Sequence, residues 1–211
     1  MSDASLMRLY WSSRSPFVRK VMVVAHETGV ISRIETTRVE VASAKLSAEV
    51  MAKNPLNKIP TLVLPDGPAL FDSRVICEYF DSLNPGPPLF PPHGPERWIA
   101  LRRETLGSGI MENGVARVGE NARPGERRSE THMTAYRTKI DRALDVLEVE
   151  AAALARDSFS IGHVTVGCAL SYLDFRFEAD GWRNGRPALS QWHKTFSERP
   201  SVVATVHANV Y

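Results

Sequence analysis

Cysteine is scarce in this sequence, with only Cys77 and Cys168 among 211 residues. Each lies in an apolar pattern typical of a helix, so we interpret both as small buried side chains and expect neither a disulfide nor a catalytic thiol. No run of 18 apolar residues is present, so we expect no membrane-spanning helix. The first residues also lack the apolar core of a signal peptide. Together these absences lead us to expect a cytoplasmic protein.

A strong excess of one charge is also missing. The chain has 26 basic and 24 acidic side chains, a balance too even to indicate a nucleic-acid partner. None of the six histidines has metal-ligand spacing with another histidine, a cysteine or a carboxylate, so we expect no metal site. What the chain does have is 43% hydrophobic content. That content can build the core of one large domain or two small ones.

The first structured stretch predicts a strand, a turn and a helix. Residues 6–11 are typical of a short strand, and residues 12–15 form a polar turn. Apolar residues after Pro16 then follow helical spacing. Ser15 suits the N-cap of this helix, and Pro16 suits its first position because proline has no amide hydrogen to leave unpaired. A helix N-terminus favours an anion, although a Ser-Pro cap by itself is common without any chemistry.

The rest of the first eighty residues mixes strands and helices. Two prolines bracket the segment Asn54–Leu62, which they force into an extended or turned conformation. Asp72 and Ser73 are N-cap candidates for an amphipathic helix that reaches Leu83. The predicted order is β-α-β-α-β-β-α, an α+β fold, with further strands at 34–41, 61–64 and 69–71 and a weak helix at 45–52.

A change of periodicity follows a proline-rich stretch at residues 84–95. No later segment alternates like a strand. We expect an all-helical second domain, whose most apolar stretch, residues 164–177, forms its buried centre. The other expected helices begin near Trp98, cover residues 133–154 and cover residues 189–196, with Pro200 closing the last one.

Three motifs in this order resemble the cytosolic glutathione transferase family. They are Ser-Pro-Phe-Val-Arg-Lys-Val at 15–21, Asn-Pro-x-x-Lys-Ile-Pro-x-Leu at 54–62, and Asp-Ser at 72–73. The first motif looks most like bacterial serine-type members with a tau-like active site. The resemblance covers essentially the whole chain. It implies a thioredoxin-like domain with a four-stranded mixed sheet at 1–83, a linker at 84–95 and an all-α domain at 96–211.

The resemblance also implies which residues hold glutathione. The backbone of Ile59, before a cis Pro60, would pair with the cysteinyl part like an added strand. Asp72 and Ser73 would face the γ-glutamyl end at a helix N-terminus. Lys45 and Lys58 are candidates for the glycyl carboxylate, Lys45 by spacing alone.

The implied reaction is conjugation of glutathione to a small hydrophobic electrophile, as in detoxification. A free thiol has a pKa of about 8.5, and lowering it by about two units requires roughly 3 kcal/mol. The Ser15 hydroxyl would stabilise the thiolate rather than act as the nucleophile. Ser12 and Ser13 are alternatives for this role.

The electrophile site is expected between the domains, a region that varies most in the family. Family members are also typically homodimers. The candidates for the electrophile site are Met111, Asn113, Gly114, Arg117 and Tyr211.

Two positions depart from the family pattern. Asn57 stands where a glycine is common, and asparagine tolerates left-handed backbone angles. His163 replaces the aspartate of a Ser/Thr-x-x-Asp capping box that begins at Ser160. A neutral His163 accepts a hydrogen bond from the Ser160 amide, whereas a protonated one cannot, so we expect the helical domain to loosen as the pH falls. The alternative, that His163 faces the solvent, is left open by the sequence.

Two other functions fit the same sequence. One is a non-catalytic GST-like regulatory protein that binds glutathione or a protein. The other is a glutathione-dependent thiol reductase or dehalogenating lyase, which often needs a cysteine where Ser15 stands.

Overall fold

The computed structural model describes residues 6–42 and 44–209. The chain divides into two compact units, one formed by the residues up to Phe90 together with those from Ala204 on, and one formed by Pro91–Val203. In the part that the structure describes, no helix combines the length and apolar character needed to cross a membrane.

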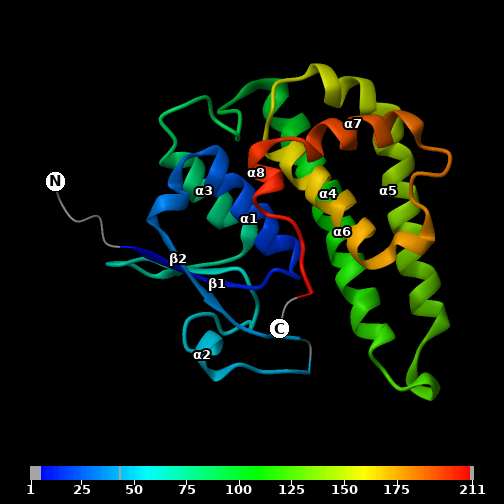
Figure 1. Cartoon of the computed structure of the whole chain (residues 1–211), viewed down its shortest axis with the longest axis horizontal. Helices are drawn as coiled ribbons and strands as arrows, with labels where there is room; N and C mark the ends of the chain where they lie inside the picture. The colour runs from blue at the N-terminus through cyan, green and yellow to red at the C-terminus, as the bar shows by residue number, and fades with distance from the viewer. Residues whose placement is uncertain (1–5, 43, 210–211) are drawn as a thin grey trace. The chain divides into compact units, whose positions relative to one another are not determined.

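A four-stranded mixed sheet organises the first unit, as the sequence predicts. Its spatial order is β2-β1-β3-β4, and only β1 and β2 are parallel. Helix α1 makes the crossover between these two parallel strands (Figure 1). The strands are β1 (Met7–Trp11), β2 (Ile34–Arg38), β3 (Thr61–Val63) and β4 (Ala69–Leu70), and the helices are α1 (Pro16–Glu27), α2 (Ala48–Met51) and α3 (Ser73–Ser82).

Successive strand residues point to opposite faces of the sheet, and neighbouring residues of β1 are buried on both faces. Leu9 and its cross-strand partner Leu62 are fully buried on one face. Tyr10 lies on the other face, in a cluster with Val50 of α2. The helix expected at 45–52 is a single turn in the structure, and Val50 is its buried residue. The resulting α+β unit is a thioredoxin-like domain.

The second unit is entirely helical in the residues described. The sequence predicts its four long helices, but it misses α8, because Pro200 begins that short helix instead of closing the preceding one. Proline suits a first helical position, where its missing amide hydrogen costs nothing. The helices are α4 (Gly94–Asn121), α5 (Glu130–Arg156), α6 (Ile161–Phe177), α7 (Pro187–Ser197) and α8 (Pro200–Val203).

Helices α4 and α6 lie side by side through small residues (Figure 1). A Cβ atom on Gly107 would lie 2.8 Å from the backbone of Thr165, and one on Gly162 would lie 2.8 Å from the carbonyl oxygen of Ala100. Two glycines therefore allow the backbones to approach closely. As expected, α6 is buried nearly all round, with Cys168 in its interior.

Candidate functional site

Strand register brings the three sequence motifs to one edge of the sheet. Tyr10 near the end of β1 pairs with Thr61 at the start of β3, so Pro60 lies beside the loop that follows β1. Strand β4 returns antiparallel to β3, so Asp72, which follows β4, reaches the same edge. The loop that carries Ser15, the Ile59–Pro60 segment and the start of α3 are therefore neighbours, although they are up to sixty residues apart in sequence.

Ser15 is the N-cap of α1, as predicted, and no residue that the structure describes accepts a hydrogen bond from its hydroxyl. The Ser15 backbone is extended (φ −85°, ψ 123°), and its Oγ accepts a hydrogen bond from the Val18 amide at 3.3 Å. Because Oγ is the acceptor in this cap, its own hydrogen is available for another acceptor. The N-terminus of α1 adds partial positive charge at this point. Ser15 can therefore donate a hydrogen bond to an anion.

The two alternative serines are placed differently. The Ser13 hydroxyl donates to the carbonyl oxygen of Ala208 at 2.9 Å, so its hydrogen is already in use. The Ser13 carbonyl oxygen also accepts a hydrogen bond from the Ala208 amide at 3.4 Å. The same oxygen lies 3.0 Å from Nδ1 of His207. Ser12 Oγ accepts a long bond of 3.4 Å from the Arg14 amide. The C-terminal segment thus engages Ser13, a contact that the sequence does not signal.

The Ile59–Pro60 peptide bond is cis, as expected. Buried Asn54 shapes the loop before it, donating to the Lys58 carbonyl oxygen at 3.1 Å and to Thr61 Oγ1 at 2.9 Å. Among the described residues, none forms a hydrogen bond with the Ile59 backbone. Its amide and carbonyl groups are therefore available to an extended ligand.

Asn57 adopts the left-handed conformation that its place in the motif suggests, with φ 53°. Its side chain also makes two bonds that glycine cannot make. Oδ1 accepts from the Ser47 amide at 2.9 Å, and Nδ2 donates to the Lys45 carbonyl oxygen at 3.0 Å. Asn57 therefore joins the loop at 54–60 to the segment that carries Lys45.

The two candidate lysines differ in their surroundings. The Lys58 side chain is exposed and lies in the loop before Pro60. Lys45 is also exposed, but its ammonium group forms an ion pair with Glu40. A second cation, Arg14, contacts the same carboxylate at 3.0 Å. Sequence reasoning did not single out Glu40 or Arg14.

Asp72 and Ser73 begin α3 as predicted. Asp72 is the N-cap, and its Oδ1 accepts from the Arg74 amide at 3.0 Å. Ser73 is the first helical residue and is buried. The amide groups of this helix start, together with its dipole, suit a carboxylate.

Four of the predicted electrophile-site residues lie on α4, and they differ in exposure. Met111 is fully buried, and Gly114 packs against the rings of Tyr172 and Phe177. Asn113 is half-buried and donates to the Gly109 carbonyl oxygen at 2.7 Å. Tyr211 lies outside the described residues.

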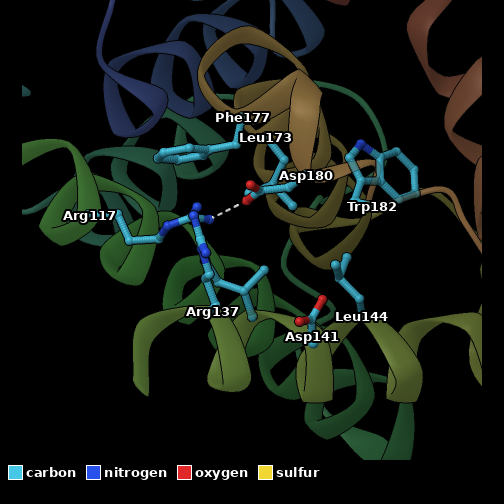
Figure 2. A pocket seen from close by; sticks show the side chains of 9 residues that line it. Arg117, Arg137, Asp141, Leu144, Leu173, Phe177, Asp180 and Trp182 are labelled. Atoms are coloured by element: carbon cyan, nitrogen blue, oxygen red, sulfur yellow. Dashed lines mark ion pairs between the residues drawn. The ribbon is translucent and has the colours of Figure 1, made fainter. Parts of the chain in front are cut away.

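Arg117 borders a cavity of about 220 Å³ within the helical unit. Figure 2 shows its guanidinium group meeting Asp180, at an ion-pair distance of 2.6 Å. The arginine also lies 4.0 Å from the centre of the Phe177 ring. Ile140, Leu144, Leu173 and Trp182 give apolar walls, and Arg137 and Asp141 also line the cavity, so charged and apolar side chains share it.

A smaller cavity of about 80 Å³ lies beside the serine loop in the first unit. Its lining combines two of the serines with apolar side chains and part of the C-terminal segment. The residues are Trp11, Ser12, Ser13, Val18, Arg19, Met22, Ala204, Thr205 and Val206.

His163 is buried at the start of α6, so the alternative that it faces the solvent is wrong. Its Nδ1 accepts from the Ser160 amide at 3.1 Å, and its Nε2 lies 3.1 Å from the Leu154 carbonyl oxygen. A neutral ring with its hydrogen on Nε2 satisfies both bonds. Burial lowers the pKa of His163 from 6.5 to about 4, and the charge of Arg103 adds to this effect. The histidine therefore replaces the family aspartate as a neutral cap.

Ser171, His193 and Asp174 are the residue types of a hydrolytic triad, but the ring hydrogen of the histidine lies on the nitrogen that faces the serine. Ser171 Oγ lies 2.9 Å from Nε2 of His193, and Asp174 lies 3.8 Å from its Nδ1. Arg183 donates to that Nδ1 at 3.3 Å, which leaves the ring hydrogen on Nε2. Ser171 itself donates to the Gly167 carbonyl oxygen. The histidine therefore donates to the serine and cannot act as its base.

The comparisons with known proteins agree with this geometry. Residues 14–83 match the model of the glutathione S-transferase N-terminal domain, and residues 130–195 match that of the C-terminal domain. The chain is 34% identical over 201 residues to the uncharacterized GST-like protein YibF of Escherichia coli, covering 94% of this chain and 98% of that one. This chain belongs to the glutathione S-transferase family.

Solved structures of the family are similar over nearly the whole chain. A glutathione transferase family member from Pseudomonas fluorescens Pf-5, solved with bound glutathione, is 42% identical, with a TM-score of 0.93 over 96% of this chain and 99% of that one. A glutathione S-transferase from Methylobacillus flagellatus KT, also with bound glutathione, is 34% identical, with a TM-score of 0.85 over 96% and 100%.

Another relative matches over part of the chain only. The stringent starvation protein A homolog of Histophilus somni is 38% identical over 112 residues, about half of each chain (51% and 50%).

Proposed function

We propose that this protein is a glutathione transferase in which Ser15 stabilises the glutathione thiolate. The observation that carries the proposal is the direction of the Ser15–Val18 hydrogen bond. Because the Ser15 oxygen accepts in the cap, its hydrogen is free to donate to sulfur. Ser13 is less suited, since its hydrogen is donated to Ala208. On this basis the protein is a serine-type enzyme with a tau-like active-site motif.

Glutathione would bind along the edge where the three motifs meet. The backbone of Ile59 would pair with the cysteinyl residue, and the amide groups at Asp72 and Ser73 would hold the γ-glutamyl carboxylate. Lys45 and Lys58 would bind the glycyl carboxylate. The bound glutathione in similar solved structures supports the choice of ligand.

The second substrate would be a small hydrophobic electrophile. The small cavity beside Ser12 and Ser13, which has a largely apolar lining, supports this class. The larger cavity beside Arg117 combines apolar walls with charged side chains. Attack by the thiolate on carbon forms the carbon–sulfur bond and either expels a leaving group with its bonding electrons or adds to a conjugated bond, after which the resulting carbanion takes a proton from water. We further propose a cytoplasmic homodimer with a role in detoxification, in a bacterial setting, with residues 1–83 binding glutathione and residues 96–211 contributing to the electrophile site.

The thiolate absorbance of bound glutathione near neutral pH tests this function. We expect a thiolate signal in the wild type that Ser15→Ala removes while calorimetry still detects binding. Ser13→Ala is the matched control and should retain the signal. Binding without any thiolate in the wild type would contradict the proposed catalysis.

A second candidate is a non-catalytic protein that binds glutathione or a protein partner. The matches over about half the length of two stringent starvation protein A homologues, whose names carry no transferase activity, are the reason to test this class. Turnover of an aryl halide with glutathione separates the two, because only the transferase would show it.

A further inference from the structure

One acidic residue, Glu40, lies between two cations beside the proposed glutathione site. Its Oε1 contacts Arg14 at 3.0 Å, and its Oε2 forms an ion pair with Lys45. The hydrogen bond and charge of Lys45 hold the pKa of Glu40 below its ordinary value, and the charges of Arg14 and Arg38 add to this effect. Glu40 is therefore ionised near neutral pH and satisfies the charge of Lys45.

The contacts around Glu40 place it at the edge of the sheet where the three sequence motifs meet. Val39, the preceding residue, donates its amide hydrogen to the Trp11 carbonyl oxygen at 3.0 Å, at the end of β1. Arg14 directly precedes Ser15. On the other side, Asn57 ties the backbone of Lys45 to the loop that carries Pro60. Glu40 thus joins the serine loop to the segment proposed to receive the glycyl carboxylate.

We propose that Glu40 is a resident counter-ion that competes with the glycyl carboxylate of glutathione for Lys45, and so determines how strongly the site selects thiol peptides that end in a carboxylate. This inference rests on the proposed function. A carboxylate ligand that reaches Lys45 takes the place of the Glu40 carboxylate there. The number of charge-assisted hydrogen bonds to Lys45 therefore does not increase. Arg14 retains Glu40 after this displacement, because it holds the other carboxylate oxygen.

With Glu40 present, a terminal carboxylate adds little affinity, since one anion replaces another at Lys45. A ligand with a neutral terminal amide leaves the Glu40–Lys45 pair intact. The wild-type protein should therefore bind ligands with a terminal carboxylate and ligands with a terminal amide with similar affinity. Glu40 is the residue that keeps the two affinities close.

Calorimetry with two matched ligands tests the role of Glu40. The ligands are S-methylglutathione and its glycinamide analogue, which differ only in the terminal charge. Neither has a thiol to ionise, so the result does not depend on Ser15. In Glu40→Gln we expect the affinity for S-methylglutathione to rise about 2- to 5-fold, the range of one partly exposed ion pair, and the affinity for the amide to remain unchanged.

Glu35→Gln is the control for net charge. Glu35 pairs with Arg8 at 3.6 Å near the opposite end of β1, so its neutralisation should leave the affinities for both ligands unchanged. In a Lys45→Gln background, Glu40→Gln should produce no gain. An unchanged or weaker affinity for S-methylglutathione in Glu40→Gln, an equal rise for both ligands, or a gain that persists without Lys45 would overturn the inference while leaving the proposed function standing. Failure of wild-type protein to bind S-methylglutathione would overturn both.

Discussion

His163 Nδ1 accepts the amide hydrogen of Ser160 at 3.1 Å, where the family pattern has an aspartate. The opposite ring nitrogen lies 3.1 Å from the Leu154 carbonyl oxygen, so the imidazole joins the end of α5 to the start of α6. Protonation adds a hydrogen to Nδ1, which removes the acceptor of this cap. The helical unit therefore depends on a histidine that stays neutral.

The first prediction concerns the pH dependence of stability. The pKa of His163 is 6.5 in an unfolded chain and about 4 in the folded protein, so the unfolded state binds more protons between these values. Stability from this residue is full above pH 6.5 and is lost as the pH falls toward 4, by about 3 kcal/mol at most. Urea unfolding across this range measures the loss.

The control for this prediction is His163→Gln. Glutamine is a usual partner in a capping box and does not titrate. We expect it to lower stability at pH 7 by about 1–2 kcal/mol through lost packing, and to flatten the decline between pH 6.5 and 4. An equally steep decline in the variant would show that other groups cause it.

The second prediction concerns helix packing in α4. Gly107→Ala places a Cβ atom 2.8 Å from the Thr165 backbone and should cost about 1–3 kcal/mol. Gly109→Ala, on the same helix, has no atom within 4 Å of the added Cβ and should instead stabilise by about 0.5–1 kcal/mol. Thermal unfolding of the two variants distinguishes these effects, and equal shifts would contradict the close α4–α6 approach.

The third prediction separates the two roles of Asn57. Asn57→Gly keeps the left-handed conformation and loses only the bonds to Ser47 and Lys45. Asn57→Ala loses the same bonds and adds the cost of a Cβ atom at φ 53°. We expect the alanine variant to be less stable than the glycine variant by about 1–2 kcal/mol, measured by urea unfolding. If the two are equally stable, the conformational role is absent.

The fourth prediction concerns the C-terminal segment. Ser13→Ala removes the 2.9 Å bond to Ala208, a loss of about 1 kcal/mol. Amide hydrogen exchange in the peptide covering 204–209 should accelerate about 5-fold. Ser12→Ala, which removes no bond to this segment, should leave exchange unchanged.

The local signals in the sequence were sufficient for most of the fold. The Ser15–Pro16 cap, the Asp72–Ser73 cap and the apolar pattern of α6 each depend on neighbours a few residues away, so each could be predicted from the sequence. The cis bond before Pro60 could be expected only because the surrounding motif resembles a family. The start of α8 at Pro200 was missed because proline both ends and begins helices.

The sequence by itself determined the strands and the helices other than α8, their order, and the motifs that resemble those of glutathione transferases. Tertiary structure engaged the Ser13 hydroxyl through a contact with Ala208 that spans 195 residues, whereas Ser12 and Ser15 both accept local hydrogen bonds. It also decided the partners of Glu40 and the burial of His163. The engagement of the Ser13 hydroxyl and the desolvation of His163 depend on groups that only the folded chain brings together, and no local pattern encodes them.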